Sequence, residues 1–269
     1  MTQRSSATCG LFLLLFGMLL LLATTGLIQV DFWGVFIPLL MIAFGGLTLW
    51  MVSTRRGGPQ HVEVHVPLEG AKSARVRVRF GAGRLTLAAG GQGDELGAVQ
   101  AFGDVRQRAT TTGDERSVEF WVPTEFLGDI LAPWKWSGLQ PPSWDVKLRE
   151  AIPLTLDVEA GACQMDLDLT SLQVRDLRLV TGASSVIVRM PGAAGETRAR
   201  ITAGAAEVKI RVPPGVAARV RVPTGLGEVK VDRGRFPGGD GLFESKDYAT
   251  AANKVDLSIE VGAASAEIS

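Results

Sequence analysis

The sequence has few of the residue types on which catalytic and metal chemistry depend. It has two cysteines, two histidines and one tyrosine in 269 residues. Cys9 and Cys163 cannot build a disulfide framework, which is weak evidence for a reducing compartment. The formal net charge is zero, so we expect no nucleic-acid partner and no general attraction to anionic surfaces.

The glycine-rich and histidine-containing stretches lack the partners that a site needs. Gly81–Gly83 and Gly90–Gly93 have no Lys-Ser/Thr and no following helix, so they predict turns and not phosphate loops. His61, Glu63 and His65 fall on one face of an expected strand, but a metal site requires three or four ligands. No serine or cysteine lies in a motif with a base. We therefore expect no catalytic residue, metal or cofactor, and no enzyme activity.

Long apolar runs occur only near the N-terminus. After a short tail at 1–9, residues 10–52 hold two such runs, Leu11–Val30 and Phe32–Val52, separated by Asp31. Each is long enough to cross a bilayer at 1.5 Å per residue, about 30 Å in all. Trp33 and Trp50 suit the interfacial aromatic belt. These features predict an α-helical transmembrane hairpin that contacts the lipid bilayer through residues 11–52. Alternatively, residues 1–26 form a cleaved signal peptide.

The flanking charges predict the orientation of the hairpin. Arg4 precedes the first run, and Arg55 and Arg56 follow the second. The positive-inside rule then places both ends of the hairpin in the cytoplasm, and cleavage of the first run would leave the larger domain on the same side. We expect a protein of the bacterial plasma membrane with a cytoplasmic domain, joined by a linker at 53–60.

Residues 61–269 contain six copies of one pattern, in which two alternating apolar stretches flank a glycine. Alternation with period two indicates a strand with one buried face. Spacings of 21, 22 and 21 residues separate copies two to five, and a spacing of 37 precedes copy six. We expect the glycines to supply positive φ or a close backbone approach at six structural turns, namely Gly81, Gly161, Gly182, Gly204, Gly225 and Gly262.

A repeat of constant length is typical of stacked architectures. The prediction is therefore an all-β solenoid-like domain in which the apolar residues of successive rungs form one core. A β-sandwich is the alternative, because its turns also recur at short intervals. Copy one is followed by an interruption of about 70 residues, which holds the segment Pro133–Trp144 with Trp134 and Trp136. We interpret this segment as a cap over one end of the stack, the other interpretation being an aromatic docking patch.

The outward positions of the repeats carry many arginines. If the rungs stack in sequence order, five of them form a basic stripe, which is a candidate partner-binding face: Arg178, Arg198, Arg200, Arg219 and Arg221. An acidic protein or the anionic inner leaflet would suit such a stripe. The alternative is an ordinary solvated sheet face, because outward strand positions usually carry alternating charge.

Several short motifs resemble those of the LiaF-type, cell wall-active antibiotics response proteins with toast-rack-like β domains. The membrane segment Phe32-Trp33-Gly34-Val35-Phe36-Ile37-Pro38-Leu39-Leu40 is similar to the membrane hairpin of that family. The β-domain motifs are Trp144-Asp145-Val146-Lys147-Leu148, Ile152-Pro153-Leu154, Gly161-Ala162, Gly182-Ala183-Ser184-Ser185-Val186, Gly204-Ala205-Ala206-Glu207-Val208 and Val212-Pro213. The resemblance implies a membrane-anchored, non-enzymatic regulator that acts through a sensor histidine kinase during envelope stress.

Three functional hypotheses follow. The first is a membrane-tethered regulator or scaffold in envelope-stress signalling that acts by protein-protein contact. The second is a self-assembling structural element whose rungs stack end to end, similar to membrane-bound bactofilin filaments, because exposed terminal rungs permit a non-closing contact. The third, an enzyme or glycan-binding module, requires an external domain and disagrees with the charge pattern.

Overall fold

The computed structural model describes residues 37–38, 40–42, 45–46, 61–91, 93–103, 105–122, 141–222 and 227–269. The chain divides into two compact units, Met1–Gly58 and Pro59–Ser269. In the first unit the described residues are helical. No helix within the described residues has the length and hydropathy that a membrane crossing requires. The hairpin predicted for residues 10–52 lies almost wholly outside the described residues, as does the linker at 53–60.

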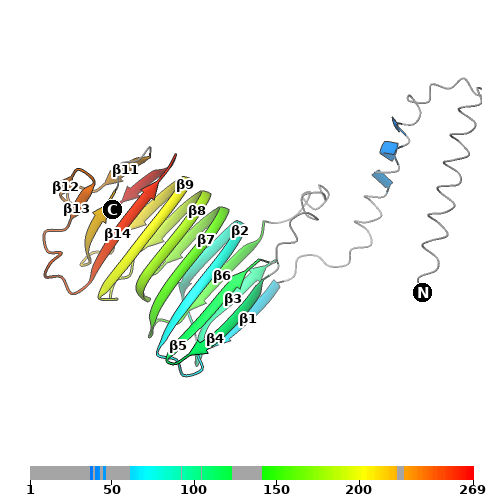
Figure 1. The fold of residues 1–269 in the computed structure, drawn as a ribbon, viewed down its shortest axis with the longest axis horizontal. Coiled ribbons are helices and arrows are strands. Elements are labelled where there is room, and N and C mark those ends of the chain that lie inside the picture. The colour runs from blue at the N-terminus through cyan, green and yellow to red at the C-terminus, as the bar shows by residue number, and fades with distance from the viewer. Residues whose placement is uncertain are drawn as a thin grey trace, which may run out of the picture. The chain divides into compact units, whose positions relative to one another are not determined.

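The second unit is built from strands (Figure 1). Their bounds, in chain order, are β1 His61–Pro67, β2 Ser73–Ala89, β3 Glu95–Phe102, β4 Arg106–Thr112, β5 Glu115–Trp121, β6 Ser143–Leu148, β7 Pro153–Asp168, β8 Gln173–Arg189, β9 Glu196–Arg211, β10 Ala217–Arg221, β11 Glu228–Val231, β12 Gly238–Gly239, β13 Leu242–Glu244, β14 Lys254–Val261 and β15 Ser265–Ile268.

Each long strand is one rung with two legs joined at its glycine. In β7, Leu156 and Val158 are buried before the glycine, and Met165 and Leu167 are buried after it. Val158 and Met165 are seven positions apart, an odd offset between two buried residues, so the alternation changes phase between the legs. The phase change lets both legs bury their aliphatic side chains in one shared core.

The turn glycines stack on one another. A Cβ added to Gly161 would lie 2.6 Å from the carbonyl oxygen of Gly81, and one added to Gly182 would lie 3.1 Å from that of Gly161. Gly204 and Gly262 continue the series, at 3.2 Å from Gly182 and 3.1 Å from Gly204. None of these glycines has positive φ. The glycines are therefore needed for close backbone approach, one of the two roles expected of them; Gly225 lies outside the described residues.

The legs form two ladders of strands that meet at the glycine corners. The first-leg ladder, which holds the residues before each glycine, has the order β12-β13-β10-β14-β9-β8-β7-β2-β5-β4. The second-leg ladder, which holds the residues after it, has the order β11-β15-β9-β8-β7-β2-β6-β3-β1. Pairing between successive rungs is parallel, so the solenoid-like prediction is confirmed.

The rungs do not stack in sequence order at the C-terminal end, and this corrects the predicted order. Copy six, formed by β14 and β15, inserts between copy four and copy five. Leu257 therefore lies between Ala199 and Val220 in the first-leg ladder. The long spacing before copy six forms the β12–β13 hairpin and a cap, which contains the buried Phe236 and Tyr248. After this loop, the chain returns as β14, which lies between β9 and β10.

The interruption after copy one contains a further rung, which is formed by β5 and β6. β5 pairs parallel to the first leg of β2, and β6 pairs parallel to its second leg. The two strands therefore extend both ladders by one level, and residues 123–140, which join them in the sequence, lie outside the described residues. Trp144, assigned to the predicted cap, is buried in β6 and packs with Phe80 at a ring-centroid distance of 5.2 Å. Trp134 and Trp136 lie outside the described residues.

Candidate functional site

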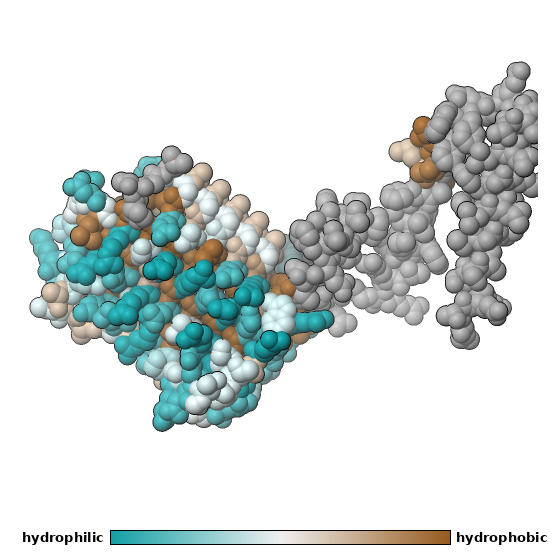
Figure 2. All heavy atoms as spheres, viewed as in Figure 1, coloured by the Kyte–Doolittle hydropathy of each residue, from teal (hydrophilic) through white to brown (hydrophobic). Residues whose placement is uncertain are grey.

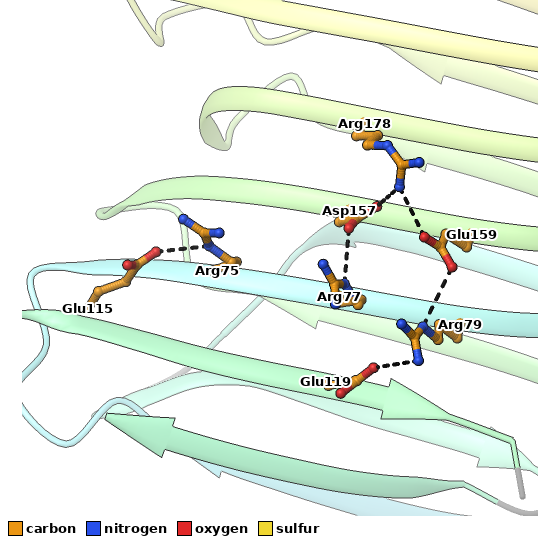
Figure 3. A network of polar contacts seen from close by, with 8 residues as sticks. All are labelled: Arg75, Arg77, Arg79, Glu115, Glu119, Asp157, Glu159 and Arg178. Carbon is orange, nitrogen blue, oxygen red and sulfur yellow. Dashed lines mark hydrogen bonds and ion pairs between the residues drawn. The ribbon is translucent and has the colours of Figure 1, made fainter. Parts of the chain in front are cut away.

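The outer face of the first-leg ladder carries the largest group of linked charges among the described residues. Figure 3 shows arginine and carboxylate side chains from β2, β5, β7 and β8 pointing toward one another across the strands. They face outward because the alternating residues between them fill the core. This face contains the five arginines that the sequence analysis predicted as a partner-binding stripe, so it is the candidate interaction surface.

Asp157 is the centre of this network. It accepts a hydrogen bond from Arg77 Nε at 3.0 Å and one from Arg178 Nη1 at 3.1 Å. Its side chain is only 12% exposed, so both guanidinium groups are needed to compensate its burial. Arg178 also binds Glu159 at 3.0 Å, and Arg79 joins Glu159 to Glu119. Hydrogen bonds to Glu159 and to Asp157 raise the pKa of Arg178, which keeps its charge fixed.

Most arginines of the predicted stripe have an acidic partner. Arg198 contacts Glu196 of its own strand at 3.5 Å. Arg221 binds Asp256 of β14 at 2.7 Å. Arg219 binds Glu244 of β13 and lies over the Tyr248 ring, 4.2 Å from its centroid. These pairs, together with those of Arg178, neutralise much of the stripe.

Arg200 differs from the other four. It is exposed, and within the described residues it has no ion-pair partner. Its cross-strand neighbours are Arg178 on β8 and Ser258 on β14. The sequence-order stack placed it beside Arg221, but the inserted β14 separates the two, so the stripe is interrupted. Of the five arginines of the predicted stripe, Arg200 is therefore the one whose charge is not neutralised by an ion pair within the described residues.

The visible surface of the β domain mixes hydrophilic and hydrophobic residues. Figure 2 shows hydrophilic side chains distributed over the strands, with hydrophobic residues visible between them. The second-leg ladder is also charged on its outer side, with pairs such as Arg189 with Asp166 and Lys209 with Glu207. Exposed pairs of this kind contribute about 0–1 kcal/mol each, so they serve solubility and register more than stability.

An open groove lies at the corner of the first rung, and sequence reasoning did not find it. Its volume is about 640 Å³, and its apolar wall includes Phe80, Trp121, Ala160 and Val180. Arg79, Arg108, Glu119 and Glu159 supply charged groups at its edge. Gly81 also lines the groove, and a Cβ added to it would meet nothing within 4 Å, unlike one added to the later turn glycines. The sequence could not predict this groove, because β5 and β6 carry no repeat glycine and were therefore not placed next to copy one.

The residues considered for metal and catalytic chemistry have other contacts. His65 lies 3.1 Å from Glu95 and 3.5 Å from Glu63, and His61 packs against the Phe102 ring. No cluster of three metal-ligating side chains occurs among the residues that the structure describes. Cys163 is buried, and desolvation raises the pKa of its thiol to about 11. A thiol with that pKa is a poor nucleophile at neutral pH.

Comparison with known proteins identifies the family. No protein of curated function matches the sequence. A solved structure of a proposed cell adhesion protein from Clostridium sporogenes ATCC 15579 aligns over 78% of this chain and 98% of its own, with 18% identity and a TM-score of 0.69. A proposed adhesin from Bacteroides fragilis NCTC 9343 aligns over 79% and 100%, with 8% identity and a TM-score of 0.26. The first shows a shared fold, whereas the second is too dissimilar to carry an argument.

The family model that matches is described as the N-terminal domain of toast_rack, DUF2154, and it covers residues 55–211. The match includes copies one to four, the β5–β6 rung and every residue of the Asp157 network. It ends at the last residue of β9, before the stacking order changes. Because the match covers more than half of the sequence, the chain belongs to this toast-rack family.

Proposed function

We propose that this protein is a membrane-anchored, non-enzymatic regulator or scaffold that acts by protein-protein contact in bacterial cell-envelope stress signalling. The apolar runs at 11–52 would anchor it in the plasma membrane, and the β domain would present its charged face on the cytoplasmic side. The toast-rack fold supports the contact-based part of this role. The LiaF-like membrane motifs support the signalling part.

The observation that carries the proposal is the organisation of the first-leg face. Parallel rungs hold its arginines and carboxylates at fixed spacing, so a partner would meet a rigid charge pattern. Arg200 is exposed and forms no ion pair within the described residues, so it is available to an acidic partner. The similarity of fold to a proposed cell adhesion protein is compatible with a role based on contact.

The partner that the LiaF resemblance favours is a sensor histidine kinase. The experiment is affinity purification of the full chain from cross-linked membranes, with the co-purified proteins identified by mass spectrometry. Arg200→Glu tests the first-leg face, and Arg211→Glu is the matched control. Arg211 is also exposed without an acidic partner in the described chain, but it lies on the second-leg face.

We expect Arg200→Glu to reduce kinase recovery at least tenfold and Arg211→Glu to leave it unchanged. Equal recovery with all three proteins would exclude the first-leg face as the contact. Recovery of no membrane kinase with the wild-type chain would refute the signalling role.

Self-assembly is the second candidate function. It is favoured by the two end strands of the second-leg ladder, β1 and β11, each of which has a single partner strand within the described residues. In that case the protein would be a membrane-tethered structural element similar to bactofilin, and the contact would be between copies of the chain.

A further inference from the structure

The two ends of the second-leg ladder are open in the described part of the chain. β1 pairs only with β3, and β11 pairs only with β15. A strand at a sheet edge presents main-chain donors and acceptors that another strand can bind. The aliphatic residues of these strands, Val62 and Val64 at one end and Val229 and Val231 at the other, are only half-buried. Both ends therefore offer hydrogen bonds and apolar area to a further rung.

The two end strands run in the same direction. β1 is antiparallel to β3, and β3 is antiparallel to β6, so β1 is parallel to β6 and to the rungs that follow. β11 is parallel to β15 and therefore to the same rungs. A second copy could thus add its β1 beside β11 and continue the parallel pairing of the solenoid.

The register of the ladder specifies which residues would meet. Each of four continuous rows runs through nine strands, from β1 to β11. The residues at the two ends of each row are His61 and Glu228, Val62 and Val229, Glu63 and Lys230, and Val64 and Val231.

Resting on self-assembly, the second candidate function above, we propose that copies of this chain associate head to tail, with β11 of one copy pairing in register with β1 of the next. Lys230 would then face Glu63 of the second copy, and the His61 imidazole would reach the Glu228 carboxylate. Val229 and Val231 would pack on Val62 and Val64, which closes the half-exposed ends of the core. The contact joins two different surfaces, so it does not close and produces rows of molecules.

The β12–β13 hairpin limits this association. In the first-leg ladder it extends two strands beyond β10, and β4 and β5 extend two strands beyond β2. If β1 of the next copy lies beside β11, the strand count places the next copy's β4 at the level of β12. The hairpin must therefore turn aside. Three residue pairs and the ion pair between Arg219 and Glu244 hold it to β10, so it acts as a brake on assembly.

The experiment is sedimentation velocity of the full chain in a mild non-ionic detergent over a wide concentration range. Glu63→Lys and Lys230→Glu each place like charges across the contact, and the double variant restores opposite charges. Both side chains are exposed, so circular dichroism should confirm that the variants fold as the wild type does. Glu244→Ala releases the brake.

We expect each single reversal to weaken association at least tenfold. The double variant should regain it, and so should an equimolar mixture of the two single variants, because each then offers an end that fits the other. Glu244→Ala should associate more tightly than the wild type.

Failure of the mixture and the double variant to recover association would overturn the proposal. So would monomeric behaviour of both the wild type and Glu244→Ala at every concentration. Neither residue lies on the first-leg face, so these outcomes are independent of kinase binding.

Discussion

At the corners, the identity of a single residue decides whether two rungs can approach. The carbonyl oxygen of one turn glycine lies 2.6–3.2 Å from the position that a Cβ of the next would take, and the contact is tightest at Gly161. Gly81 begins the series and has open space around its own Cβ position. Two glycines in the same motif are therefore under different constraints, which the sequence pattern alone does not distinguish.

Gly161→Ala and Gly81→Ala test this difference as a matched pair. In Gly161→Ala, the new Cβ would meet the Gly81 carbonyl oxygen at 2.6 Å, so the rungs must separate. We expect a loss of about 1–3 kcal/mol in the free energy of unfolding, measured by urea denaturation. Gly81→Ala should change stability by about 1 kcal/mol or less. Equal destabilisation by both substitutions would contradict the stacking role.

Residue patterns predicted the core well and the surface less well. The alternation around Gly161, Gly182 and Gly204 identified inward positions that are buried in the structure. The spacing of charges identified the arginines of the first-leg face but not their neighbours. Asp256 and Ser258 lie beside those arginines only because β14 inserts between β9 and β10. Burial follows from local alternation, whereas the surroundings of a surface charge depend on the order of the strands.

Among the elements, β14 has the greatest influence on the C-terminal end. It is the penultimate strand of the chain, yet it lies in the interior of the first-leg ladder, between β9 and β10. The 37-residue spacing before copy six predicted a loop, but no sequence rule specified where the chain would return. The β5–β6 rung was missed for a related reason, because its two strands are not joined by the short glycine motif of the repeats.

Ile259→Ala should loosen this end selectively. Ile259 is fully buried on β14, and its truncation should cost about 2–5 kcal/mol. Because β10, β11 and β13 join the stack through copy six, we expect faster hydrogen exchange in 217–244 than in β7 and β8. Leu179→Ala, at a fully buried position on β8, is the control and should accelerate exchange in β7 and β9 instead. Identical exchange patterns for both variants would argue against the inserted rung as a separate unit.

At the scale of the whole molecule, the sequence separates an apolar N-terminal part from a β domain, and the structure divides into two compact units after Gly58. The solenoid-like fold of the β domain could be predicted from the regular spacing of its repeats, because few architectures place equivalent strands at a fixed distance along the sequence. The predicted sidedness rests on Arg4, Arg55 and Arg56, which lie outside the described residues.

Reporter fusions test that sidedness. A fluorescent protein that matures only in the cytoplasm, fused after Ser269, should fluoresce, and alkaline phosphatase at the same place should be inactive. Fusion of each reporter after Asp31, in the predicted turn between the two apolar runs, is the control and should give the reverse result. Active phosphatase after Ser269 would place the β domain outside the cytoplasm and contradict the proposed topology.

The β5–β6 rung shows that a corner can be rebuilt without altering its legs. β5 and β6 keep parallel pairing with β2 although 18 residues, 123–140, separate Val122 from Pro141 in the sequence, where the repeats have only a short glycine motif. Relatives could therefore acquire new specificity by exchanging one such insert while the rungs on either side keep their sequences.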